Sequence, residues 1–224
     1  MKKDWDTQAL ISRIEANRNP DFAVPMAAYM RGKFPFLGIK TPLRKELVKE
    51  HFSEYHLPKP SELSEVAWEI YHLPEREYQY VAIEVLEKMK NCLTVDDLPF
   101  LRQLIESKSW WDSVDAIAPR IVGSVVLANR EDGSPIMLDW SHSDNLWTNR
   151  SAILHQLKYK EQTDTALLKS IILRHAGSTE FFLQKSIGWA LREFAKTDAE
   201  WVRTFVDTHH LSPLSTREAL KHLT

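Results

Sequence analysis

The amino-acid sequence predicts an all-α protein built from short antiparallel helices. Only six of its 224 residues are glycine, and alternation of apolar and polar residues typical of strands is scarce. Apolar residues instead recur at helical spacing, in segments separated by short turns. With 43% hydrophobic and 27% charged residues, the composition is that of a globular chain long enough to bury a substantial core.

Start signals place several of these helices in order along the chain. Asn19 and Thr41 each precede a proline, which suits the first position of a helix. Leu73-Pro74-Glu75 opens another segment in a similar way, and Ser215 with Glu218 forms a capping-box pattern. Together with the periodicity, these signals predict helices near residues 6–17, 21–32, 42–52, 61–72, 75–90, 95–107, 110–128, 132–141, 144–159, 164–175, 179–196, 199–209 and 216–222.

Helices of this number and length, joined by short turns, favour a solenoid of helical hairpins over a non-repetitive bundle. Units of roughly 35 to 45 residues fall in the range of HEAT and armadillo repeats, although self-similarity between the units is too weak to prove repeats. Solenoids curve, so the concave face is where function is expected. We expect one domain over residues 1–224.

Composition excludes several classes of protein. No apolar run approaches the ~20 residues that a membrane-spanning helix needs, and the first residues lack the apolar core of a secretory signal. Cys92 is the only cysteine, which excludes a disulfide framework and fits a reducing cytosol. We read Cys92 as a buried, small apolar residue.

The net charge of −2 does not indicate a nucleic-acid-binding protein, but the charges are unevenly distributed. Residues 25–50 hold six Lys and Arg against two Glu, whereas residues 51–100 hold four basic against ten acidic side chains. This segregation permits separate basic and acidic surfaces, and scattered solvated faces explain it equally well.

The segment KSWWDSVD at residues 108–115 carries the strongest chemical signal. In a helix, Trp111 and Asp115 lie one turn apart on the same side. Ser109 suits the N-cap and Asp112 the third helical position, which leaves Asp115 to project beside the Trp111 ring. An aromatic surface next to an anion is a pocket for a cation.

Three other positions are open to two interpretations. Gly188 lies inside a helical segment beside Trp189, which indicates that a neighbouring helix or a ligand approaches the backbone closely. Arg150 fits either a phosphate contact or an ion pair of little energetic weight. Tyr29 fits a core position better than a cleft on base rates.

The usual enzyme signatures are absent. His209 and His210 are adjacent and make a poor zinc chelate, and there is neither a phosphate-binding glycine loop nor a serine elbow. We expect no metal and no cofactor, so catalysis would rest on a carboxylate, aromatic rings and water.

These residues resemble the AlkD-type DNA alkylation repair glycosylases, which are HEAT-like repeat proteins. The resemblance covers nearly the whole chain and lies in eight blocks in the family's order: residues 25–30, 36–42, 73–77, 108–115, 152–160, 180–185, 188–193 and 214–222. It implies a right-handed superhelical solenoid with a concave DNA-binding face. Block 108–115 is the most discriminating, because non-enzymatic relatives are expected to lack it.

Carried over residue by residue, the resemblance makes Asp115 the catalytic carboxylate and Trp111 and Trp189 the aromatic walls of the site. Arg150 matches a groove arginine near the DNA backbone, and Tyr29 a further cleft residue. We expect additional DNA contacts from the cationic side chains of the matching blocks, Lys158, Lys185 and Arg192.

The resemblance implies hydrolytic release of cationic N3- and N7-alkylpurines from double-stranded DNA, without full extrusion of the base and without strand cleavage. The expected protein is a soluble cytoplasmic monomer, associated with the nucleoid when bound to DNA and making no membrane contact. The alternative is a helical-repeat scaffold that binds DNA or protein without chemistry.

Overall fold

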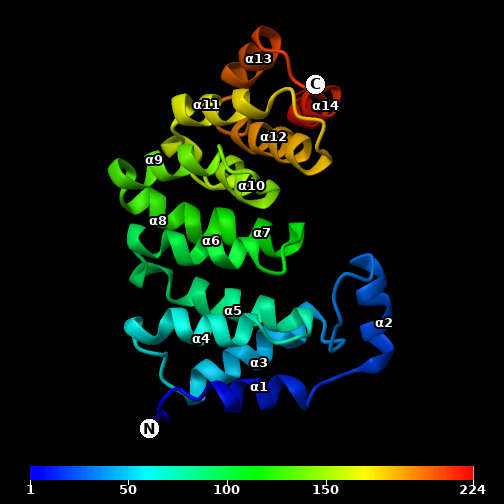
Figure 1. Ribbon diagram of the computed structural model, residues 1–224, viewed down its shortest axis with the longest axis vertical. Helices are drawn as coiled ribbons and strands as arrows, with labels where there is room; N and C mark the ends of the chain where they lie inside the picture. The colour runs from blue at the N-terminus through cyan, green and yellow to red at the C-terminus, as the bar shows by residue number, and fades with distance from the viewer. Residues whose placement is uncertain (224) are drawn as a thin grey trace. The chain divides into compact units, whose positions relative to one another are not determined.

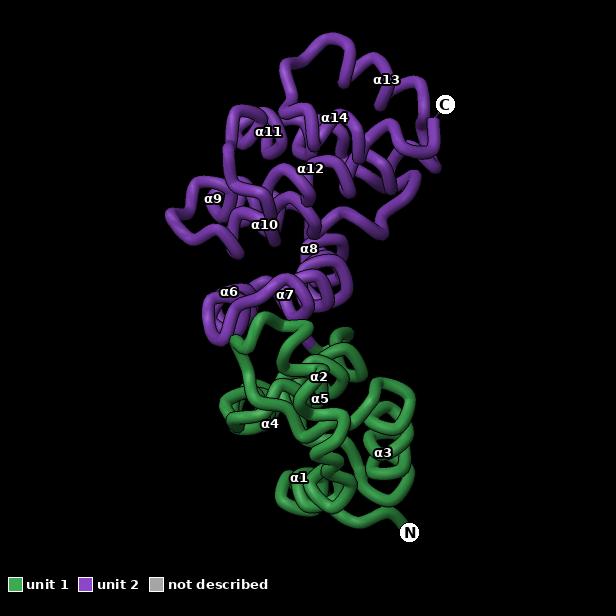
Figure 2. The backbone as a smooth tube through the Cα atoms, turned by 90° about the vertical axis from the view of Figure 1, so that its right-hand side faces the viewer, with its two compact units in different colours: residues 1–92 green, residues 93–224 purple. Residues whose placement is uncertain are grey.

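In a computed structural model that describes residues 1–223, the chain is all-helical. One isolated bridge between Lys3 and Tyr55 is the only β pairing in this range, so the predicted all-α class is confirmed. The chain divides into two compact units, residues 1–92 and 93–224 (Figure 2). The single domain, the concave face and the handedness of a superhelix stay predictions.

The first unit contains five α-helices within its described residues. They are α1 (Thr7–Glu15), α2 (Pro20–Tyr29), α3 (Thr41–Glu54), α4 (Leu63–Tyr71) and α5 (Arg76–Lys88). Helices α4 and α5 pack most extensively on each other, and α1 and α3 complete the core, which includes Leu10, Ile70 and Leu86. Helix α2 has no buried residue and stands apart from the other four (Figure 1).

A buried carboxylate fixes the loop that follows α2. Glu77 of α5 is fully buried and accepts the backbone N–H groups of Leu37, Gly38 and Ile39 at 2.9–3.0 Å. Gly38 has φ +88°, and a Cβ there would lie 1.9 Å from the carbonyl oxygen of Asn19. The glycine of block 36–42 therefore has a structural explanation.

The second unit, up to residue 223, contains the remaining nine α-helices. They are α6 (Leu98–Glu106), α7 (Trp111–Ile117), α8 (Gly123–Ala128), α9 (Arg130–Trp140), α10 (Leu146–Leu154), α11 (Thr165–His175), α12 (Phe181–Phe194), α13 (Ala199–Thr208) and α14 (Pro213–Leu220). They succeed one another as stacked antiparallel layers (Figure 1), and α10 lies at the centre, in contact with α6, α7, α9, α11 and α12. No helix among residues 1–223 combines the length and apolar character needed to cross a membrane.

Several element boundaries differ from prediction for local reasons. The predicted helix 110–128 is helical, but residues Ala118–Val122 form a π-helical turn around Pro119, which lacks an N–H to donate. Helix α10 ends at Leu154, five residues before the predicted end. Asn19 caps α2 as predicted, whereas Thr41 is the first residue of α3 and makes no capping bond. Cys92 is exposed, so its predicted burial is wrong.

Candidate active site

Helix α7 presents Trp111 and Asp115 one turn apart, as the spacing predicts. Its cap differs from the prediction, because Trp110 is the N-cap residue and makes no side-chain capping bond. The Ser109 hydroxyl instead donates to the carbonyl of Ile105, 2.7 Å away at the end of α6. Ser109 therefore ties α7 to the preceding helix.

The carboxylate of Asp115 is held by a bidentate ion pair with Arg150 of α10. The guanidinium Nε lies 2.8 Å from Oδ1, and Nη2 lies 2.9 Å from Oδ2. Arg150 also donates through Nη1 to the carbonyl of Phe182. Its side chain is 5% exposed against 17% for Asp115, so the arginine lies behind the carboxylate and orients it.

Burial raises the pKa of the Asp115 carboxyl, while the hydrogen bonds and positive charge of Arg150 oppose that shift and nearby Asp112 adds to it. Arg150 uses one lone pair on each carboxylate oxygen, and an ionised carboxylate has about four such sites. Asp115 therefore keeps acceptor capacity for a water molecule or a positively charged group.

Asp115 and Arg150 open into a pocket of about 290 Å³, at the low end of the usual size of ligand sites. Trp111 of α7 and Trp189 of α12 line it, and so do two further cations predicted from the sequence, Lys185 and Arg192. Phe181, Phe182 and Glu218 complete the lining. The structure thus brings together six of the eight residues predicted for the site.

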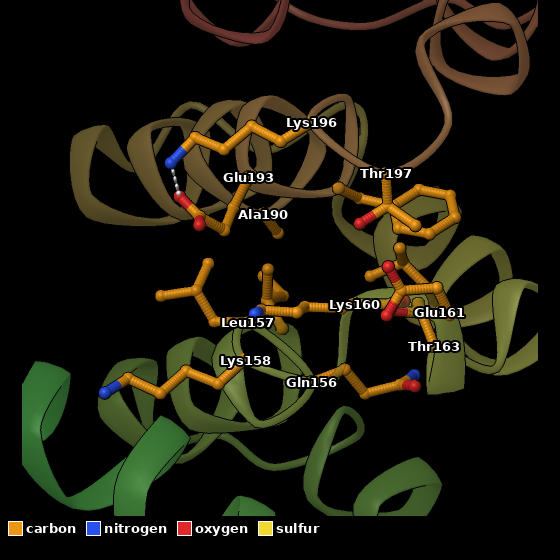
Figure 3. Close-up of a pocket in the computed structure, with 13 residues that line it drawn as sticks. Gln156, Leu157, Lys158, Lys160, Glu161, Thr163, Ala190, Glu193, Lys196 and Thr197 are labelled. Atoms are coloured by element: carbon orange, nitrogen blue, oxygen red, sulfur yellow. Dashed lines mark hydrogen bonds and ion pairs between the residues drawn. The ribbon is translucent and has the colours of Figure 1, made fainter.

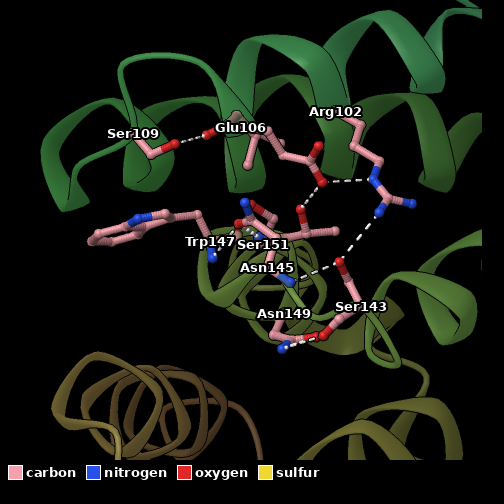
Figure 4. A network of polar contacts seen from close by, with 10 residues as sticks. Arg102, Glu106, Ser109, Ser143, Asn145, Trp147, Asn149 and Ser151 are labelled. Atoms are coloured by element: carbon pink, nitrogen blue, oxygen red, sulfur yellow. Dashed lines mark hydrogen bonds and ion pairs between the residues drawn. The ribbon is translucent and has the colours of Figure 1, made fainter.

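A polar network fixes the start of α10 and hence the position of Arg150 (Figure 4). The side chain of Asn145 accepts the backbone N–H groups of Trp147 and Thr148, which caps the helix. Thr148 donates to Glu106 of α6 at 2.7 Å, and Arg102 joins Glu106 to Ser143. These bonds anchor the first turn of α10 to α6.

A cluster of aromatic rings adjoins the pocket, since Phe182 belongs both to the cluster and to the pocket lining. Trp110, Trp147 and Phe182 form a cluster with ring centroids 5.0–5.6 Å apart. Trp147 comes from α10 and Phe182 from α12, so the cluster joins the helices that carry Arg150 and Trp189. Offset and edge-on ring pairs of this kind hold neighbouring helices in register.

Helix α14 packs against α12 at Gly188. A Cβ on Gly188 would lie 2.4 Å from the Cβ of Glu218 and 2.9 Å from the carbonyl oxygen of Ser215. Of the two explanations for this glycine, the neighbouring helix is the one observed. The close approach brings Glu218 to the pocket, where it pairs with Lys185 at 2.8 Å and Arg192 at 2.6 Å.

The predicted capping box at Ser215 and Glu218 is wrong. Helix α14 begins at Pro213 with Ser212 as its N-cap, and the Ser215 hydroxyl donates to the carbonyl of Gln184 in α12. Both residues of the pattern therefore make contacts between helices in place of capping bonds.

Two predicted DNA contacts lie outside this pocket. Lys158 lines a second cavity, of about 570 Å³, between the segment after α10 and the end of α12 (Figure 3). There it accompanies Lys160 and the Lys196–Glu193 pair. Tyr29 belongs to the first unit, where it ends α2 and is 71% exposed. Its assignment to the core on base rates is wrong, and its role in the site stays a prediction.

Sequence reasoning missed Phe181, Phe182 and Glu218. The two phenylalanines stand in block 180–185 beside Lys185, and that proximity is the signal that could have found them. Glu218 carried a misleading signal, because its spacing from Ser215 matches a local capping motif. Among residues 1–223, no three His, Cys, Asp or Glu side chains come close enough to hold a metal ion.

One pocket on the helices of the second unit thus combines a carboxylate held by an arginine, two indole rings and two further cations. Comparison with known proteins shows the class to which this helical chain belongs. The family described as DNA alkylation repair enzyme matches residues 10–223, and this chain belongs to that family.

A solved structure described as a predicted DNA alkylation repair enzyme from Enterococcus faecalis is similar to this chain. The two share 36% sequence identity with a TM-score of 0.85, over 92% of this chain and 97% of that one. No curated protein matches. The matched range covers every residue that lines the pocket.

Proposed function

We propose that the protein is a DNA glycosylase that hydrolyses the N-glycosidic bond of cationic N3- and N7-alkylpurines in double-stranded DNA. The observation that carries the proposal is the pocket in which Asp115, held by Arg150, lies with Trp111 and Trp189. Membership of the DNA alkylation repair enzyme family supports it.

The chemistry needs no general acid. Alkylation at N3 or N7 makes the purine a cation, so when the bond from C1′ of the deoxyribose to the base breaks, its electron pair leaves with a neutral base. Positive charge then develops on the sugar, as in the oxocarbenium-like transition states of glycoside hydrolysis. A water molecule adds to C1′ and loses a proton, which Asp115 accepts and passes to solvent.

Each side chain has a distinct role in this scheme. Asp115 stabilises the positive charge on the sugar and orients the water. Arg150 holds both carboxylate oxygens, so the acid need not reorganise during the reaction. The faces of Trp111 and Trp189 contact the cationic base or sugar, and each cation–π interaction contributes roughly 0.5–2 kcal/mol.

We propose that the reaction proceeds without full extrusion of the base, as the resemblance to the alkylpurine glycosylases implies. We propose that the enzyme acts as a monomer. We assign its action to the cytoplasm, at the nucleoid.

One observation favours the alternative of a non-catalytic DNA-binding scaffold. The Asp115 carboxylate already has a complete ion pair, which could serve packing alone. Incubation of the protein with a methylated duplex decides between the two. We expect free methylpurine and intact strands that break only after alkali, whereas tight binding without any released base would identify a scaffold.

A further inference from the structure

We propose that Glu218 is a positioning residue that presents Lys185 and Arg192 as a two-cation clamp for one phosphate of the DNA strand. The proposal rests on the proposed function, because it takes DNA as the ligand. It gives α14 a role in the site that the carboxylate–tryptophan arrangement alone does not require.

The geometry is that of one carboxylate shared by two cations. Lys185 and Arg192 lie two turns apart on the same side of α12, and each takes a different oxygen of Glu218, at 2.8 and 2.6 Å. This contact holds the pKa of Glu218 below its usual range, with the Lys185 hydrogen bond as the largest cause. Glu218 is therefore ionised at neutral pH.

Glu218 lies beneath the cations that it holds. Its side chain is 14% exposed, against 38% for Lys185 and 23% for Arg192. An ammonium has three N–H donors and a guanidinium five. Glu218 takes one polar contact from each cation, and these are the only ion pairs of the two side chains among residues 1–223, so further donors remain for a ligand in the pocket.

The charges select the ligand. Two cations and one carboxylate leave a net charge of +1, which matches the single negative charge of a phosphodiester. A phosphate offers two oxygens that two neighbouring cations can contact together. A clamp already held in place loses less side-chain freedom on binding than two free cationic chains do.

The packing of α14 makes the clamp rigid. Gly188 allows the Cβ of Glu218 to approach the α12 backbone, and the Ser215 hydroxyl donates to the carbonyl of Gln184 at 2.9 Å. The pair of Glu193, on the same helix, and Lys196, just beyond its end, lacks this support. It is a local i,i+3 pair with side chains 64% and 35% exposed, which makes Glu193 the matched control.

The test measures the dissociation constants of an undamaged duplex and an N7-methylguanine duplex for Glu218→Gln, Glu218→Asp and the control Glu193→Gln. If Glu218 acted only through its charge, its neutralisation would tighten DNA binding. The clamp predicts the opposite: Glu218→Gln raises the dissociation constants of both duplexes roughly tenfold, as expected for loss of a phosphate contact. Glu193→Gln binds as tightly as the natural protein, or slightly more tightly.

Glu218→Asp keeps the charge but is one methylene shorter, so it cannot reach both cations together. The clamp predicts weaker binding for this variant too, whereas an effect of charge alone predicts no change. The variant Lys185→Ala/Arg192→Ala completes a mutant cycle, in which adding Glu218→Gln weakens binding no further, because no cation is left for Glu218 to position. Thermal unfolding followed by circular dichroism confirms that each variant is folded.

Tighter binding by Glu218→Gln, unchanged binding by Glu218→Asp, or additive effects in the cycle would overturn the clamp. Release of methylpurine by the natural protein tests the proposed function separately. If the natural protein releases base but Glu218→Gln binds DNA more tightly, the proposed function stands and the clamp is rejected. If the binding constants follow the predicted pattern but no base is released, the clamp stands and the glycosylase activity is rejected.

Discussion

At the scale of single residues, the Asp115–Arg150 pair combines two requirements of a catalytic carboxylate. Burial strengthens its interaction with a developing cation, because water competes less. Burial also favours the protonated form, which would remove the charge. Arg150, at 2.8 and 2.9 Å, opposes that protonation and fixes the direction of the carboxylate.

The pH dependence of base release tests this interpretation. Because the pKa of Asp115 is raised, the rate falls on acidification at a pH above the ~3.9 of an ordinary aspartate. In Arg150→Gln the carboxylate loses its positive neighbour, so its pKa rises further and the acid limb moves to higher pH. Single-turnover rates measured between pH 4 and 8 check this, and an unshifted acid limb in Arg150→Gln would count against the pairing.

At the scale of elements, the site depends on how α7, α10, α12 and α14 meet. Gly188 controls the closest of these contacts, because a side chain there would collide with Ser215 and Glu218 of α14. Gly177, in the turn after α11, has open space at the same position and meets no atom within 4 Å. These two glycines form a matched pair.

We therefore expect Gly188→Ala to lower the free energy of unfolding by about 1–3 kcal/mol, the usual effect of overpacking. Gly177→Ala changes it by less than ~0.5 kcal/mol. Urea denaturation of the two variants measures both effects. Equal stabilities would show that α14 yields to the new methyl group and that its contact with α12 is loose.

The element scale also shows what local sequence can and cannot predict. The spacing of Trp111 and Asp115 on α7 and the cap at Asn19 follow from rules within one helix, and both are confirmed. Glu218 matched the local capping-box rule, yet its carboxylate forms ion pairs with two cations of another helix. The partner of Arg150 was equally hidden, since Asp115 lies 35 positions away along the chain.

At the scale of the whole molecule, the chain has two compact units, and all residues that line the candidate site belong to the second. The all-α class followed from the glycine count and from helical periodicity. The arrangement of the layers did not, because packing between helices depends on side-chain contacts far apart in the sequence. The eight blocks of resemblance and the family match agree in covering both units.

Each unit also contains a buried histidine that links stability to pH. Burial lowers the pKa of His51 in the first unit and of His155 in the second to about 4. Both are neutral in the fold, while the unfolded chain binds their protons near pH 6.5. Stability therefore falls as pH drops from about 6.5 to 4, by roughly 1.4 kcal/mol per pH unit for each histidine.

Urea unfolding at pH 7 and pH 5 measures this dependence, and His155→Gln isolates the contribution of that histidine. We expect the difference between the two pH values to shrink in this variant. An identical pH dependence with and without His155 would show that other groups govern acid unfolding.

The central claim is that Asp115 acts on the sugar of an alkylated nucleotide. Its most direct test is single-turnover release of 7-methylguanine from a methylated duplex by Asp115→Asn, with Asp112→Asn, on the same helix, as control. We expect Asp115→Asn to bind the duplex nearly as well as the natural protein and to release almost no base, while Asp112→Asn remains active. Full base release by Asp115→Asn would contradict the account.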